Sequence, residues 1–372
     1  MGQGSGMARL STLEMKSMSK RILSLVTGVF CFLLAPLSAQ VPSAAASPAQ
    51  PDAVAGPLII YHAGSVSASL KSVEAAFARE HPGIVIVDKF GGSVDLARRV
   101  TVGNEPADLY ASADYKDIDI LLKPKYATYT IRFAQGAMVL VYRSDDANPL
   151  AKVKEIADPA VAFNPNSNPP AIPAATPEWY KILAQPGVWI GGGDPGGDPG
   201  AYRALLIMQL AQIYYHQPGL YQALLNNDTF GKGSAAPATP NYRFIYESSA
   251  LALARTDTNL RLARLPAEIA LSDSSLENYY AQASVTIPGL SKGDPPVTIP
   301  ASRVTWGITL LNTSKNSANA IAFLRFLLTP GKGGALQQAA GPEPILPALV
   351  SQDDYTKVPA DLRSLLRSTE LP

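Results

Sequence analysis

The sequence predicts an α/β fold with mainly parallel sheets, because strand-like and helix-like segments alternate along the chain. Two further observations support this prediction. Residues 137–143 (AMVLVYR) form an uninterrupted apolar run, as expected of a strand buried in an α/β sheet. Three strand-like segments also pass through a short turn rich in small or acidic residues directly into a helical pattern. The 372 residues suffice for one large or two medium domains.

The predicted elements begin near residue 57. A strand at 58–61 precedes a helix at 67–80, in which Leu70, Val73 and Phe77 recur at helical spacing. The remaining predicted elements, in chain order, are strand 84–87, helix 93–102, strand 108–112, strand 137–143, a proline-rich surface loop at 158–178, strand 187–192, helix 201–216, strand 303–311, and helix 316–330 ending at Pro330.

The N-terminus has the pattern of a cleavable signal peptide. Lys20 and Arg21 precede an apolar stretch at 22–35, and small residues follow at 37–39. The apolar stretch is shorter than the roughly 20 residues of a membrane span, so we expect cleavage and export to the periplasm. The predicted signal peptide covers residues 1–39, of which 1–17 are candidates for a stretch upstream of the true start.

The mature chain is expected to begin with a disordered leader at residues 40–56, which are rich in Ala and Pro. Cys31 is the one cysteine of the chain and lies inside the apolar stretch of the signal peptide. The mature chain would therefore lack disulfides, thiol chemistry and cysteine-ligated metals. The net charge of +1 gives no support for nucleic-acid binding, which normally requires a basic excess.

Two similar turns predict an anion site. Residues 62–66 (HAGSV) and 91–94 (GGSV) each join a strand to a helix, and they place Ser65 and Ser93 beside the glycines Gly64 and Gly92. A helix N-terminus offers free backbone N–H groups and a favourable dipole to an anion. Turns at the carboxyl ends of neighbouring strands would face one crevice. The alternative is that both serines cap their own helices.

A third turn, GGGDPGGDPG at 191–200, adds Asp194 and Asp198. Its glycines formally match the G-x-G-x-x-G dinucleotide fingerprint, but two prolines and two carboxylates do not suit a pyrophosphate. The alternative for Asp198 is an ordinary helix N-cap.

The chain resembles the periplasmic substrate-binding proteins of tungstate/molybdate ABC transporters. The resemblance covers most of residues 57–340. The matching stretches include YHAGSVSASLKSVEAAFAREHPGIVI, GGSVDLARRV, ADLYASADY, PEWYKILAQPGVWIGGGDPGGDPGAYRALL, FIYESSA and AIAFLRFLLTPGKGGALQQAAG. It implies a type II periplasmic-binding-protein fold, in which two α/β lobes joined by hinge strands close on an oxoanion without catalysis.

The resemblance also implies the site. Ser65 and Ser93 match the two ligand-binding serines of the family, Tyr246 matches its binding tyrosine, and Asp198 matches a carboxylate that coordinates the tungsten or molybdenum of the bound oxoanion. The family carries a second coordinating glutamate, whereas the corresponding segment 226–242 contains no glutamate. Glu247 and Asp194 are candidate substitutes. The implied partners are an oxoanion, a permease and, through it, a cytoplasmic ATPase; the protein would be a monomer without a cofactor.

The chain is predicted to cross between two lobes twice, so that lobe one consists of two separate segments. Lobe one comprises residues 57–136 and 309–372, and lobe two comprises 137–308. The long strands 137–143 and 303–311 are the hinge candidates, and ligand binding would shift an open–closed equilibrium.

Other functions stay open at this stage. A related binding protein for sulfate or an organic anion is the first alternative, and the altered 226–242 segment favours it. An exported hydrolase is the second, although the chain has no G-x-S-x-G or H-E-x-x-H motif. A pairing of His62 with Ser65 is the remaining route to such an activity. A scaffold or adhesin is the third. The histidines His62, His81 and His216 lack metal-ligand spacing.

Overall fold

The structure, a computed structural model, describes residues 54–370. These residues belong to one compact unit. The predicted signal peptide, with Cys31, and nearly all of the predicted leader lie outside the described residues. Within residues 54–370, no helix is long and apolar enough to cross a membrane.

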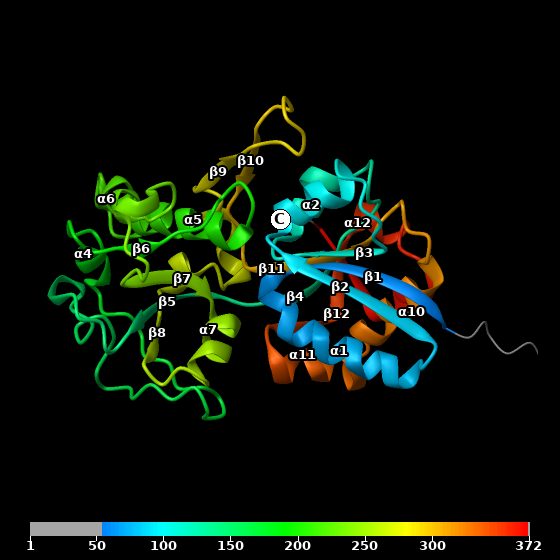
Figure 1. Cartoon of the computed structure of the whole chain (residues 1–372), viewed down its shortest axis with the longest axis horizontal. Coiled ribbons are helices and arrows are strands. Elements are labelled where there is room, and N and C mark those ends of the chain that lie inside the picture. Colours follow the sequence, from blue (N-terminus) through cyan, green and yellow to red (C-terminus); the bar gives the residue numbers. More distant parts are fainter. Residues whose placement is uncertain (1–53, 371–372) are drawn as a thin grey trace, which may run out of the picture. The chain divides into compact units, whose positions relative to one another are not determined.

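The larger sheet has seven strands in the order β13-β12-β4-β11-β3-β1-β2. Its strands are β1 (Gly56–Ala63), β2 (Ile84–Gly91), β3 (Leu109–Ser112), β4 (Ile131–Gln135), β11 (Thr305–Leu310), β12 (Glu343–Ser351) and β13 (Leu366–Thr369). Strands from both ends of the described chain therefore share one sheet, which Figure 1 shows as blue, cyan, orange and red elements together.

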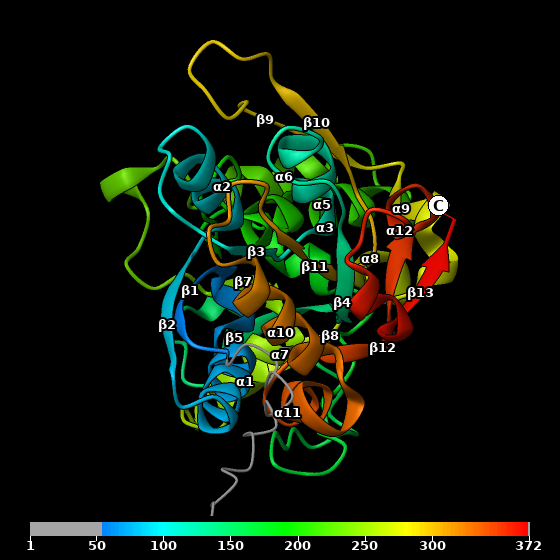
Figure 2. The ribbon, with the colours of Figure 1, turned by 90° about the vertical axis from the view of Figure 1, so that its right-hand side faces the viewer.

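Helices cover both faces of this sheet. On one side lie α1 (Ser67–Glu80), α10 (Ser317–Leu328) and α11 (Ala335–Ala340), and on the other lies α2 (Ser93–Thr101) (Figures 1 and 2). Phe77 of α1 packs edge-on against Phe323 and Phe326 of α10, with ring centroids 5.3 and 5.6 Å apart. The helical spacing of the apolar residues in α1 therefore serves to bury one face of that helix. The short helices α3 (Tyr115–Asp117) and α12 (Gln352–Tyr355) complete this part.

The smaller sheet has four strands in the order β6-β7-β5-β8. Its strands are β5 (Met138–Arg143), β6 (Ile190–Gly191), β7 (Tyr242–Tyr246) and β8 (Leu260–Arg264). Its helices are α4 (Trp179–Leu183), α5 (Pro199–Tyr214), α6 (Leu220–Asn227), α7 (Glu247–Ala254), α8 (Ala267–Ala270) and α9 (Glu277–Tyr280). A separate antiparallel pair is formed by β9 (Ser284–Ile287) and β10 (Val297–Pro300).

The α/β prediction is confirmed, but the prediction of mainly parallel sheets is wrong. Strand β1 runs parallel to both of its neighbours, whereas β11 and β5 are antiparallel to all of theirs. The reason lies in the connections. Strand β11 re-enters the larger sheet from the smaller one rather than through a crossover helix, so no right-handed βαβ unit fixes its direction.

Most predicted elements are found within a few residues of their expected bounds. The helix predicted at 67–80 is α1 with those bounds, and residues 158–178 contain only turns and isolated bridges. The strand predicted at 187–192 shrinks to β6, because Gly187 adopts a φ of 88° that breaks an extended run. The chain passes from the larger sheet to the smaller one between β4 and β5, and it returns just before β11. The lobe boundaries stay a prediction.

Candidate ligand-binding site

The two serine turns lie side by side at one edge of the larger sheet. Strands β1 and β2 pair in parallel with Ala63 opposite Gly91, so both turns begin at the same level. Neither hydroxyl caps its own helix: Val66 and Gly92 occupy the N-cap positions of α1 and α2, and neither cap has a side-chain hydrogen bond. The alternative that both serine side chains cap their own helices is therefore wrong, and the two hydroxyls have other partners.

Ser65 and Ser93 have different surroundings. The Oγ of Ser65, which is half-buried, accepts a hydrogen bond of 2.9 Å from Nε1 of Trp306. Ser93 is fully buried, and its Oγ accepts a hydrogen bond of 3.0 Å from the backbone N–H of Ala113. Because each oxygen is held as an acceptor, each hydroxyl proton can turn towards another acceptor. An oxoanion is an acceptor of this kind.

Asp198 caps helix α5 and also borders the pocket described below. Its Oδ1 accepts a hydrogen bond of 3.0 Å from the N–H of Gly200, so the N-cap prediction is confirmed. The side chain reaches solvent but has protein on most sides, and this partial burial raises the pKa of its carboxyl above the ordinary value of 3.8. Asp194 is exposed and accepts a hydrogen bond of 2.8 Å from the N–H of Gly196, which shapes the turn.

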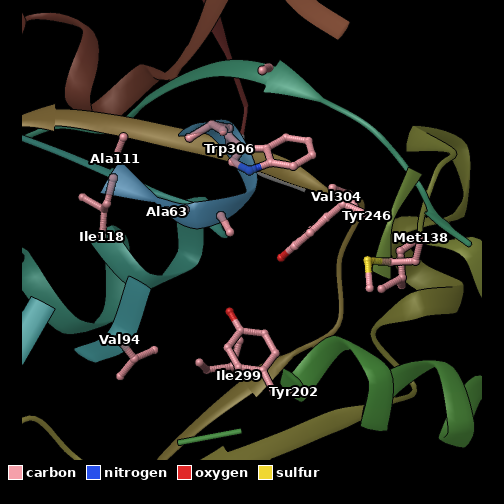
Figure 3. Packing of buried hydrophobic residues seen from close by; sticks show 14 of the residues in the cluster. Ala63, Val94, Ala111, Ile118, Met138, Tyr202, Tyr246, Ile299, Val304 and Trp306 are labelled. Atoms are coloured by element: carbon pink, nitrogen blue, oxygen red, sulfur yellow. The ribbon is translucent and has the colours of Figure 1, made fainter. Parts of the chain in front are cut away.

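Tyr246 ends strand β7 and is held by a buried arginine. Nη1 of Arg203 lies 3.5 Å from the Tyr246 hydroxyl, and the guanidinium lies 5.6 Å from the ring centroid. Figure 3 shows Tyr246 beside Trp306, with the hydroxyls of Tyr246 and Tyr202 directed into the same space. The Tyr246 and Trp306 ring centroids are 5.1 Å apart. Burial raises the pKa of Tyr246, so the phenol stays neutral and can donate a hydrogen bond.

A buried polar network stands behind this tyrosine. Arg203 is fully buried, and its Nη2 lies 3.1 Å from Oδ2 of Asp114. The Tyr202 hydroxyl donates to Asp114 at 3.0 Å and to Asp117 at 3.2 Å. Burial and the neighbouring charge of Asp114 raise the pKa of Asp117 to about 8. The network joins α5 to the segment after β3, and it fixes the position of Arg203 under the site.

One pocket collects half of the eight predicted residues. It has a volume of about 580 Å³, and Ser65, Asp198, Tyr246 and Gly64 all line it. Six of its lining residues are glycines: Gly64, Gly91, Gly191, Gly192, Gly193 and Gly200. Glycines of this kind let a ligand approach the backbone closely.

Four predicted residues do not line this pocket. Ser93 lies behind it, and Gly92 instead contacts the turn that carries Asp198. Asp194 stays in its own turn. Glu247 forms an ion pair of 2.9 Å with Arg264 and borders a different pocket.

Gly92 allows α2 to touch that turn directly. A Cβ atom at this position would lie 2.6 Å from the carbonyl oxygen of Gly197 and 3.2 Å from Cβ of Asp198. Two hydrogen bonds form at the contact. The N–H of Asp95 donates to Gly197 O at 3.1 Å, and Nη1 of Arg98 donates to Gly196 O at 2.8 Å. The N-terminus of α2 is therefore bound to the Asp198 turn.

The sequence did not identify Arg243, an exposed cation that lines the pocket from strand β7. On β7 it alternates with Tyr242 and Phe244, which are buried, as an ordinary surface residue of a strand would. Of the described residues that line the pocket, Asp198 is the one carboxylate. Asp228, in the altered segment, is buried against Gly192 and accepts a hydrogen bond of 2.7 Å from the N–H of Phe230.

Two α/β parts with a glycine-rich, anion-compatible pocket define a solute-binding protein. Residues 58–341 match the family described as bacterial extracellular solute-binding protein, and the chain belongs to this family.

Among its relatives, an uncharacterized solute-binding protein of Petrotoga mobilis is 29% identical, over 84% of this chain and 91% of the relative. The molybdate/tungstate-binding protein WtpA of Pyrococcus abyssi is also 29% identical, over 84% and 90%. Among solved structures, the sulfate-binding protein SubI of Mycobacterium tuberculosis is similar with a TM-score of 0.52 and 17% identity, over 84% of this chain and 94% of that chain. The type II binding-protein fold is thereby confirmed.

Proposed function

We propose that this protein captures an oxoanion, tungstate or molybdate, in the periplasm and delivers it to the permease of an ABC importer. The observation that carries the proposal is the meeting of Ser65, Asp198 and Tyr246 in one pocket, although they come from three distant parts of the chain. The names of the relatives from Pyrococcus abyssi and Thermococcus kodakarensis support the choice of ligand. Export by the predicted signal peptide and energy from a cytoplasmic ATPase complete the proposal.

Binding would combine hydrogen-bond donors with one metal ligand. The Ser65 hydroxyl and the neutral Tyr246 phenol donate to the oxygens of the anion, and the N-terminal end of α1 favours its negative charge. A bare carboxylate beside a dianion is repelled. Asp198 avoids this cost because its oxygen can join the coordination shell of an electron-poor hexavalent metal centre. Sulfate and phosphate offer no such site, so Asp198 would supply the selectivity.

Capture would be coupled to closure rather than to catalysis. Ser65 belongs to the predicted lobe one (57–136 and 309–372), whereas Asp198 and Tyr246 belong to the predicted lobe two (137–308). A ligand held by all three residues favours the arrangement in which α2 contacts the Asp198 turn. The protein would act as a monomer, and it would bind its solute without transforming it.

A second candidate is a receptor for another oxoanion such as sulfate. Arg243 favours it, because a cation in the pocket neutralises an anion without needing a metal centre. The described lining residues also include a single carboxylate. One carboxylate oxygen would raise the metal centre of a bound oxoanion from four-coordination to five rather than six, which reduces the advantage of tungstate or molybdate over sulfate.

Calorimetric titration of the exported chain with tungstate, molybdate and sulfate separates the candidates. Asp198→Asn is the test variant, and Asp194→Asn is the matched control, because both lie in the same turn and only Asp198 lines the pocket. We expect tight binding of tungstate and molybdate, no heat with sulfate, loss of binding in Asp198→Asn and retention in Asp194→Asn. Equal binding of all three anions by both variants would instead identify a general oxoanion receptor.

The hydrolase alternative has a separate test. Turnover of ester or phosphate substrates by the wild-type chain, lost in Ser65→Ala, would reject the binding-protein proposal.

A further inference from the structure

A second group of chemically active side chains lies behind the serine turns. His62 on β1, Glu74 on α1 and Asp88 on β2 each direct one ligand atom to a common point, and these atoms all lie within 4.8 Å of one another. His62 is fully buried, Glu74 is 7% exposed, and the Asp88 side chain is 19% exposed. None of the three lines the oxoanion pocket.

The three converging atoms have no hydrogen-bond partner among the described residues. They are Nε2 of His62, Oε1 of Glu74 and Oδ1 of Asp88. Buried polar atoms normally have a partner, because an unpaired one loses its hydration without compensation. Three such atoms meeting at one point therefore indicate a shared partner that the described residues do not supply.

The hydrogen bonding of His62 defines which ring nitrogen is free. Its Nδ1 lies 2.9 Å from the carbonyl oxygen of Ala63, which can only accept, so Nδ1 carries the proton. In the neutral ring, Nε2 then presents a lone pair. A ligating histidine commonly donates its other N–H to a backbone carbonyl in this way.

The contact between His62 and Asp88 would be an ion pair if the ring were protonated, but it lacks the geometry of a hydrogen bond. Nε2 and Oδ1 are 2.6 Å apart, yet both atoms remain without a hydrogen-bond partner. When a metal ion lies on the axis of a ring nitrogen lone pair, the other ligand oxygens lie off that axis. The geometry suits a shared cation better than a proton on the line between the two atoms.

We infer that His62, Glu74 and Asp88 form a binding site for a divalent transition-metal ion, with zinc as the best match. One imidazole nitrogen and two carboxylate oxygens are common zinc donors, and water can supply the fourth ligand. Ligand atoms about 2.0–2.1 Å from a tetrahedral zinc ion lie about 3.4 Å from one another. Nε2 of His62 and Oδ1 of Asp88 are 2.6 Å apart, and all three ligand atoms lie within 4.8 Å of one another, so small side-chain shifts would complete the site.

Charge supports the same inference. Two carboxylates face one point, and their like charges repel unless a cation lies between them. The nearest cation, Lys71, is 4.0 Å from the outer oxygen Oδ2 of Asp88 and lies over the ring of Phe90 at 4.7 Å. Lys71 therefore leaves the inner oxygen Oδ1 for another cation.

A bound ion would link three elements that support the serine turn. His62 lies three residues before Ser65, and Glu74 lies on the helix that follows this turn. The ion would fix β1, β2 and α1 to one another, and it would do so whichever oxoanion the pocket binds. The inference is therefore independent of the proposed function.

The test uses the full exported chain, stripped with a chelator and titrated with Zn²⁺ and with Co²⁺ in a buffer free of oxoanions. We expect one equivalent of Zn²⁺ to bind with a micromolar or lower Kd, a Co²⁺ absorption band of tetrahedral type, and a rise in Tm on zinc addition. Glu74→Gln should weaken binding at least tenfold. His216→Asn removes a histidine outside the cluster and should leave binding unchanged.

Asp88→Asn, at the more exposed position, repeats the test if Glu74→Gln fails to fold. Zinc binding that survives in the folded cluster variant would place the ion elsewhere and overturn the inference. The lack of any zinc binding at 100-fold excess of zinc would also overturn the inference. In that case ¹⁵N chemical shifts should show a doubly protonated His62 ring, because a proton would then be the shared charge.

Discussion

Gly92→Ala is expected to weaken oxoanion binding by separating α2 from the Asp198 turn. The added Cβ would lie 2.6 Å from Gly197 O, a backbone atom that cannot turn aside as a side chain can. The two hydrogen bonds at this contact, from Asp95 N–H and from Arg98, would be lost or lengthened. Each contributes about 1 kcal/mol net, and Arg98 gains no more because it is partly exposed. A loss of about 2 kcal/mol corresponds to an affinity about 30-fold lower.

The assay is calorimetric titration of wild type and variant with tungstate, together with a thermal unfolding curve for each. Gly331→Ala is the control for the general effect of replacing glycine, because a Cβ there meets no atom within 4 Å. Its affinity should equal that of the wild type. If folded Gly92→Ala bound tungstate within about twofold of the wild type, the contact would have no part in ligand capture, and the reasoning from closure would fail.

Four other changes have expected outcomes. Because the pKa of Asp198 is raised and metal coordination needs its carboxylate, tungstate affinity should fall as the pH is lowered towards that pKa; calorimetry should show the same fall in the binding-competent variant Asp194→Asn, and an affinity independent of pH would contradict the role of Asp198. Arg243→Gln should weaken every oxoanion about fivefold to tenfold and reduce the salt dependence of binding, since about 1 kcal/mol of charge interaction is lost. Trp306→Phe removes the N–H donor to Ser65 and should cost about 1 kcal/mol of affinity; unchanged calorimetry would show that the hydroxyl needs no support. The folded chain binds a proton on Asp117 up to about pH 8, whereas the unfolded chain loses it near pH 3.8, so the free energy of unfolding should fall as the pH rises between these values. Urea unfolding should show a smaller fall with pH in Asp117→Asn, which has no proton to lose at this position.

Local sequence patterns predicted the elements that depend on local chemistry. Helix α1 was predicted with its observed bounds because Leu70, Val73 and Phe77 mark a buried stripe at helical spacing. Strand direction depends instead on where the chain returns to a sheet. No residue pattern within β11 reveals that it arrives from the other sheet, so the parallel prediction failed there.

The site divides in the same way. Ser65, Asp198 and Tyr246 follow from motifs next to helix starts and from the family resemblance, and the structure brings them into one pocket. Trp306 was missed because its bond to Ser65 spans 241 residues of sequence. Arg243 was missed because an exposed cation on a strand is ordinary until the opposite wall of a pocket is known.

Arg203 shows why the pocket can hold an anion although few charges line it. Its guanidinium is fully buried, 3.1 Å from Asp114, and contacts the Tyr246 hydroxyl rather than the pocket itself. A buried cation paired with a carboxylate keeps little net field at long range, but it polarises the group that it touches. The Arg203 charge therefore reaches the ligand through the phenol of Tyr246, as a stronger hydrogen-bond donor at a fixed place. Under the proposed function, selectivity would then depend on Asp198, whose oxygen would favour an anion with a metal centre over one without.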